Sequence, residues 1–75
     1  MNIKNILAEN IRYFRKKSNL TQEKLADESG LHRTYIDSIE NKHRNVSIEN
    51  IDAIAKALSI KTFELLKEQK GVKYD

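Results

Sequence analysis

The chain of 75 residues has 14 Lys and Arg against 11 Asp and Glu, two glycines, and no cysteine or proline. Such a length predicts a single domain over residues 1–75, and the high charge without proline favours an all-helical fold. Without cysteine, disulfides and thiolate metal sites are excluded. The apolar runs are too short for a signal peptide or a membrane span, so we expect a cytoplasmic protein without membrane contact.

The first expected helix runs from Ile3 to about Ser18, where apolar residues recur on one face. That stripe comprises Ile3, Ile6, Leu7, Ile11 and Phe14. Lys16 and Lys17 lie in the last turn, where positive charge suits a helix C-terminus. The excess of positive charge lies before residue 46, with nine Lys and Arg against six Asp and Glu, and five of each follow. This distribution is typical of a polyanion binder.

Residues 22–41 predict two short helices joined by a tight turn at Gly30, which can adopt a positive φ. Thr21 is a suitable N-cap for the first of them, and Ser47 for a later helix. Leu25 and Ala26 are expected to face inward from the first helix, and Ile36 and Ile39 from the second, while Leu31 follows the turn. The opposite face of the second helix is polar, with short side chains and one guanidinium, which suits entry into a major groove.

Four residues on that polar face are candidate base contacts: Arg33, Thr34, Asp37 and Ser38. The guanidinium of Arg33 matches guanine O6 and N7. Asp37 would repel phosphate unless it accepts from cytosine N4 or orients Arg33, and the i to i+4 spacing favours the second role.

Candidate contacts to the DNA backbone surround this helix. Gln22 lies at a helix N-terminus, where an anion is favoured, and Tyr35 borders the polar face. The expected loop after the helix adds Lys42, His43, Arg44 and Asn45. The alternative is that these side chains are only solvated. His32 and His43 are too few to form a metal site without cysteine.

Two further helices are expected, from Ser47 and over residues 62–69, with a frayed tail at 72–75. The stripe of the fourth helix comprises Ile48, Ile51, Ile54, Ala55 and Leu58. Ile60, Phe63 and Leu66 offer an apolar dimer surface, although Phe63 would equally suit the core of one monomer. The C-terminal helices, residues 47–69, are thus expected to serve both the core and dimerisation. The predicted fold is a compact bundle of five short helices.

The stretch QEKLADESGLHRTYIDSIEN resembles the helix-turn-helix of phage-repressor/Cro-type regulators, with alanine fifth, glycine ninth and aliphatics tenth, fifteenth and eighteenth. The resemblance implies a lambda-repressor-like DNA-binding domain. Arg15 and Glu40 each border the seam between two helices, and both match the inter-helix salt bridge of this family. We therefore expect a structural role for both residues.

The segment LHRTYIDSIE, followed by HRNVS and a short helix, is most similar to the controller proteins of restriction–modification systems. That similarity implies a homodimer that binds palindromic operators upstream of its own gene and the endonuclease gene. It leaves a contact with RNA polymerase open, and no cofactor or small-molecule ligand is expected.

Other classes are a small phage-type repressor, or an antitoxin or adaptor whose main surface binds a protein partner. An enzyme is not expected, because the sequence has no cysteine nucleophile, no glycine-rich phosphate loop and no histidine beside a carboxylate cluster. RNA binding is not favoured either, because no set of exposed aromatics offers a stacking platform.

Overall fold

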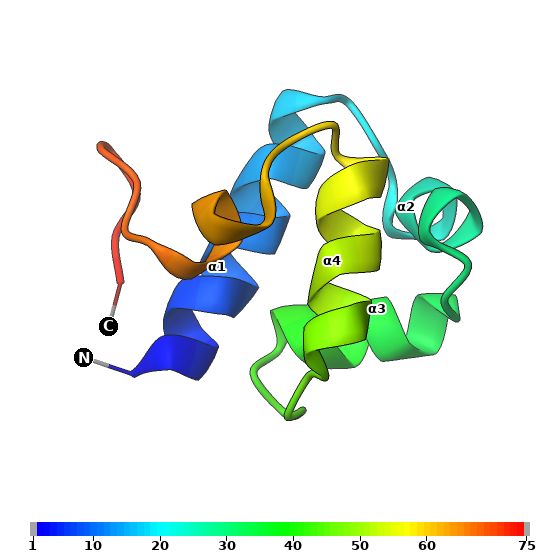
Figure 1. Cartoon of the computed structure of the whole chain (residues 1–75), viewed down its shortest axis with the longest axis horizontal. Helices are drawn as coiled ribbons and strands as arrows, with labels where there is room; N and C mark the ends of the chain where they lie inside the picture. The colour runs from blue at the N-terminus through cyan, green and yellow to red at the C-terminus, as the bar shows by residue number, and fades with distance from the viewer. Residues whose placement is uncertain (1, 75) are drawn as a thin grey trace.

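The computed structural model describes residues 2–74, and every regular element within them is helical (Figure 1). The four α-helices are α1 (Ile3–Lys17), α2 (Gln22–Ser29), α3 (Arg33–Glu40) and α4 (Ile48–Ala57). A short 3₁₀-helix, η1 (Thr62–Leu66), follows them. The predicted all-α class is confirmed, and the fifth helix is of the tighter 3₁₀ kind.

The helix ends are formed by the capping residues that the sequence predicted. Thr21 Oγ1 accepts from the Lys24 N–H at 3.0 Å, and Ser47 Oγ accepts from the Asn50 N–H at 3.1 Å. Both predicted N-caps are therefore confirmed. Gly30 ends α2 with φ of +75°, a left-handed conformation in which glycine has no Cβ to clash. The chain can therefore turn sharply into α3.

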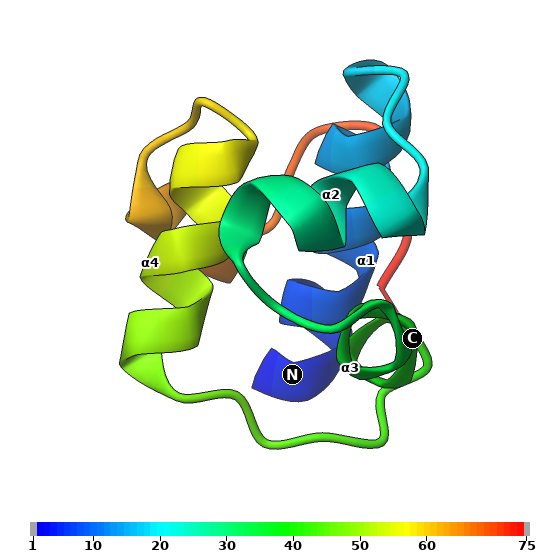
Figure 2. The same ribbon diagram turned by 90° about the vertical axis from the view of Figure 1, so that its right-hand side faces the viewer.

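Side chains from all five elements meet in one apolar core. Helix α1 packs against α3 and η1, whereas α4 packs against α2 and η1, so the core lies between the two longest helices (Figures 1 and 2). Its buried members are Leu7, Ile11, Leu25, Ala26, Ile36, Ile39, Ile51, Ile54, Ala55, Leu58 and Leu65. The inward face predicted for α2 and α3 is confirmed.

Two isoleucines that belong to the predicted apolar stripes lie outside the core. Ile3 is 53% exposed and Ile48 is 79% exposed. Each is the first residue of its helix. At such an end the helical period continues, but neighbouring elements cover little of the side chain.

The chain after η1 is held by a buried polar side chain and not by a longer helix. Asn10 in α1 donates from Nδ2 to the backbone carbonyls of Leu65 at 2.9 Å and Lys67 at 2.7 Å. In a longer helix these carbonyls would accept from backbone N–H groups further along the chain. The helix predicted for 62–69 therefore ends at Leu66.

The tail predicted to fray, residues 72–75, is folded back as far as Tyr74. The Tyr74 hydroxyl donates to Oδ1 of Asn10 and accepts from the Gln69 N–H at 2.9 Å. Both ends of the Asn10 amide are thus hydrogen-bonded, as a fully buried amide requires. Asp75 lies outside the described residues.

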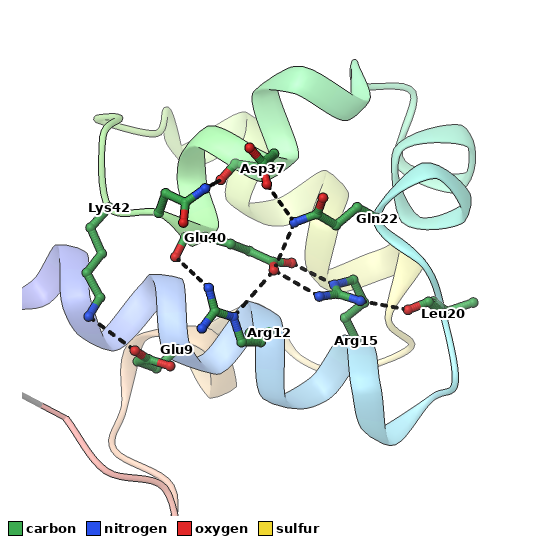
Figure 3. A network of polar contacts seen from close by, with 9 residues as sticks. Glu9, Arg12, Arg15, Leu20, Gln22, Asp37, Glu40 and Lys42 are labelled. Atoms are coloured by element: carbon green, nitrogen blue, oxygen red, sulfur yellow. Dashed lines mark hydrogen bonds and ion pairs between the residues drawn. The ribbon is translucent and has the colours of Figure 1, made fainter.

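An ion pair between Arg15 and Glu40 joins α1 to α3 (Figure 3). Arg15 Nε lies 2.7 Å from Glu40 Oε2, and Arg15 Nη2 lies 3.0 Å from Oε1, so the pair is bidentate. The Glu40 side chain is 1% exposed and that of Arg15 is 12% exposed. The hydrogen bond to Glu40 is the main cause that raises the pKa of Arg15 above its ordinary value. The salt bridge expected between these residues is present.

Further contacts from α1 surround this pair. Arg15 Nη1 donates to the carbonyl of Leu20 at 2.9 Å, where the chain passes towards α2. Arg12 Nε lies 3.6 Å from Glu40 Oε1, and its Nη2 donates to the Glu40 carbonyl at 3.3 Å. Positive charge at this place also favours the C-terminal end of α3. Helix α1 therefore holds both the side chain and the backbone at the end of α3.

We expect Arg15→Ala to lower the free energy of unfolding by about 3–5 kcal/mol, because it removes the main partner of a buried carboxylate. Arg12→Ala is the matched control: Arg12 is more exposed and lies further from the same carboxylate, so its loss should be within about 1 kcal/mol. The double change Arg15→Met with Glu40→Leu should cost far less than Arg15→Ala alone. Urea denaturation measures all three, and an Arg15→Ala protein as stable as wild type would contradict the role of the pair.

Candidate nucleic-acid interface

The α2–α3 pair presents one face of α3 to solution. Figure 2 shows α2 running across the view with α3 below it, seen nearly along its axis, so the two helices cross steeply. The Leu31 N–H donates to the Ala26 carbonyl at 3.0 Å and closes the turn between them. Ile36 and Ile39 are buried, which turns the opposite side of α3 outward.

The outward face contains the four candidate base contacts. Arg33, Thr34 and Asp37 are exposed, and Ser38 is half-buried. Within residues 2–74, no hydrogen bond or ion pair engages the Arg33 side chain. The structure does not contain the Arg33–Asp37 pair that the sequence favoured, because Asp37 bonds to Gln22 of the neighbouring helix. The guanidinium of Arg33 is thus available to a ligand.

Gln22 bridges two carboxylates through its amide nitrogen (Figure 3). Nε2 lies 3.1 Å from Asp37 Oδ1 and 3.2 Å from Glu40 Oε1. An amide flipped the other way would direct its oxygen at two anions, so the donating orientation is required. Both amide hydrogens are therefore engaged inside the protein. The contact expected between Gln22 and a phosphate stays a prediction.

Tyr35 and Arg44 pack together at the side of α3. The Arg44 guanidinium lies 5.5 Å from the centre of the Tyr35 ring, a cation–π contact, and Arg44 Nε lies 3.4 Å from Ser38 Oγ. The Tyr35 hydroxyl accepts from Asn50 Nδ2 of α4 at 3.1 Å. Arg44 is thus folded back along the outward face and remains exposed.

The loop after α3 holds the remaining candidate backbone contacts. His43 and Asn45 are exposed, in accordance with their expected availability to solvent or phosphate. Lys42 Nζ lies 3.1 Å from Glu9 Oε2 of α1 (Figure 3), with its side chain 35% exposed. A phosphate contact from Lys42 would therefore compete with this ion pair.

A shallow hollow lies where the first turns of α2 and α3 meet. It is lined by Arg15, Thr21, Gln22, Glu23 and Arg33. The first backbone N–H groups of α2 are not used by intrahelical bonds and favour an anion. Arg15 is neutralised by Glu40, so the unpaired guanidinium of Arg33 and the N–H groups of α2 make the hollow suited to a phosphate.

The residues expected to form a dimer surface differ in exposure. Phe63 is 56% exposed and Leu66 is 39% exposed, whereas Ile60 is half-buried against the core. The alternative of Phe63 as a core residue of one monomer is therefore wrong. Its ring lies on the outer side of η1, because Leu65 is the residue of that helix that fills the core.

Sequence reasoning missed three participants in this arrangement. Arg12 lies one turn before Arg15 on α1, and this spacing could have indicated that both contact Glu40. Glu9 and Asn50 contact residues far along the chain, and no local pattern indicates those contacts.

Across residues 2–74, no three His, Cys, Asp or Glu side chains are grouped as metal ligands. No helix in the same range is both long enough and apolar enough to cross a membrane.

Comparison with known proteins places this geometry in a family. A family model described as helix-turn-helix matches residues 11–65. Control protein C.SmaI of Serratia marcescens is 54% identical over 69 residues, which cover 92% of this chain and 82% of that protein. Control protein C.BamHI of Bacillus amyloliquefaciens is 50% identical over 66 residues, covering 87% and 82% respectively.

A solved structure shows the same fold on DNA. The restriction–modification controller protein C.Esp1396I, bound to a 25 base pair operator site, superposes with a TM-score of 0.80 and 35% identity. The match covers 88% of this chain and 91% of that one. Taken with the exposed α3 and the buried pair behind it, these similarities show that the chain is a DNA-binding transcription regulator and belongs to the helix-turn-helix control proteins of restriction–modification systems.

Proposed function

We propose that the protein is a dimeric autoregulator that binds a palindromic operator with α3 in the major groove. The observation that carries this proposal is the outward face of α3, where an unpaired Arg33 stands on a helix fixed by the buried Glu40 pair. Operator binding by C.Esp1396I supports it. Binding upstream of its own gene and of a linked endonuclease gene would let occupancy set the level of both products.

Arg33 and its neighbours carry the sequence preference in this proposal. The free guanidinium can donate two parallel hydrogen bonds to guanine O6 and N7. Thr34 is exposed one residue further and can contact a base edge or a thymine methyl. The Ser38 hydroxyl lies deeper, beside Arg44. Asp37 completes the base-contacting face.

The surrounding groups are proposed to hold the phosphates. The Tyr35 hydroxyl accepts its hydrogen bond from Asn50 and keeps its own hydrogen free to donate. Arg44, His43 and Asn45 extend this surface beyond the end of α3, and Lys42 joins it on release from Glu9. On the other side of α3, Gln22 lines the hollow at the start of α2 and would reach a phosphate there only on release from Asp37.

Specific binding to an operator needs a second copy of the chain. Two copies related by a two-fold axis place their recognition helices about 34 Å apart, one turn of DNA. We propose that Phe63, Leu66 and Ile60 form the surface between them, because the first two are exposed apolar side chains outside the α2–α3 pair. Phe63 is the proposed anchor at its centre.

The cellular location and a protein partner follow from the proposed role in transcription. We propose that the protein works in the cytoplasm, because its target is DNA and the relatives named above are bacterial. A contact with RNA polymerase, on a surface that the DNA leaves open, would allow activation as well as repression.

Arg33→Ala should remove discrimination among operator variants more than it weakens general affinity. A bidentate contact to guanine is worth about 1–3 kcal/mol of discrimination. Competition binding with operators altered one base pair at a time measures this. An unchanged ranking of the variants in Arg33→Ala would show that α3 does not read the bases through this residue.

Arg44→Ala should weaken specific and non-specific DNA alike and lower the salt dependence by roughly one unit of slope. Lys61→Ala is the matched control, because Lys61 is an exposed cation in the connection between α4 and η1. Titrations at several salt concentrations separate the two variants. Equal slopes for Arg44→Ala and wild type would remove Arg44 from the phosphate contacts.

Wild-type protein should sediment as a dimer at low micromolar concentration and bind a palindrome more steeply than a half-site. Phe63→Ala should dissociate the dimer without unfolding, since the ring is largely exposed. Ile48→Ala is the control for loss of an exposed apolar side chain elsewhere. A monomer that binds one half-site as tightly as a palindrome would overturn the dimer.

A further inference from the structure

Asp37 is an unusual residue for a face that meets DNA, because its negative charge is repelled by phosphate. It is exposed near the middle of the outward side of α3, four residues after Arg33. Neither Arg33 nor any other cation neutralises it within residues 2–74. A carboxylate that only served solubility would be better placed on a surface away from DNA.

The Asp37 carboxylate is oriented by a chain of contacts that starts in the core. Arg15 fixes Glu40 through two hydrogen bonds, and the fixed Glu40 accepts from Gln22 at 3.2 Å. The second hydrogen of the same amide is donated to Asp37 Oδ1 at 3.1 Å (Figure 3). Within residues 2–74, Asp37 Oδ2 makes no hydrogen bond or ion pair and remains open to solution. The orientation of an exposed carboxylate is thus set by a buried one.

We propose that Asp37 is a specificity-determining residue whose carboxylate, held by Gln22, accepts a hydrogen bond from the N4 amino group of an operator cytosine. The inference rests on the proposed function, since it needs α3 to lie in the major groove. Gln22 is then a positioning residue, because it acts on the base through Asp37.

The chemistry of the major groove supports this choice of base. Cytosine presents N4–H₂ as a donor there, and a carboxylate can only accept, so the two are complementary. Guanine and thymine present acceptor oxygens, which a fixed carboxylate repels. Asp37 therefore adds discrimination by excluding wrong bases, and it lowers affinity for DNA that lacks the cytosine.

The test is selection of bound sites from a random DNA library, followed by competition binding at each half-site position. Wild-type protein should show one position that prefers cytosine by about ten- to hundredfold. Asp37→Ala should lose that preference while binding other sequences at least as tightly. Asp37→Asn should turn the preference at the same position towards adenine, which pairs with an amide through N6 and N7.

Gln22→Met separates a positioning role from a direct phosphate contact, because it keeps the length of the side chain and removes the amide. We expect a several-fold loss of preference at the Asp37 position alone, with the other positions unchanged. A uniform loss of affinity for all sequences would mean that Gln22 binds phosphate, and it would overturn the positioning of Asp37 by Gln22. Thermal melting of each variant excludes general unfolding as the cause.

Asp27→Ala is the matched control, since Asp27 is an exposed carboxylate on α2 outside the proposed interface. It should leave every base preference intact. Preferences that survive unchanged in Asp37→Ala would overturn this inference and leave the proposed function standing. A wild-type protein without any base preference would overturn both.

Discussion

The buried carboxylate of Glu40 is the constraint on which the position of α3 depends. Helix α3 has eight residues, too few to be stable by itself in water. Ile36 and Ile39 bury its inner face, but apolar contacts alone tolerate small shifts along and around the helix axis. A desolvated anion does not tolerate such shifts, because it must keep its hydrogen-bonding partners at bonding distance. Arg15 and Arg12 therefore fix the rotation of α3, and with it the residues that face outward.

Much of the fold could be predicted because its determinants are local. Hydrophobic periodicity located the core face of α2 and α3, and the types of residue at Thr21, Gly30 and Ser47 located helix ends. The end of the chain could not be predicted in this way. Its path depends on Asn10, whose amide bonds residues more than fifty positions away, and a buried asparagine on a helix looks like an ordinary polar residue in the sequence.

The candidate site, like the fold, has local features that the sequence predicts and long-range contacts that it does not. The residues that face outward from α3 follow from helical geometry once its inner face is known. Their partners do not, because those lie on other elements. The sequence offered Arg33 as a partner for Asp37, since only neighbours one turn apart on one helix are visible there. The structure brings in Gln22 from α2, which is already anchored by Glu40.

The contact between Arg44 and Tyr35 has an optical consequence. The chain has no tryptophan and three tyrosines, so its near-ultraviolet emission comes from tyrosine. Tyr35 lies on the helix proposed to enter DNA, whereas Tyr13 packs against Phe14 within α1 and Tyr74 bonds to Asn10. A change in the place of Arg44 would alter the electric field over one ring and leave the other two unaffected. The unlabelled protein therefore has a built-in fluorophore next to the surface of interest.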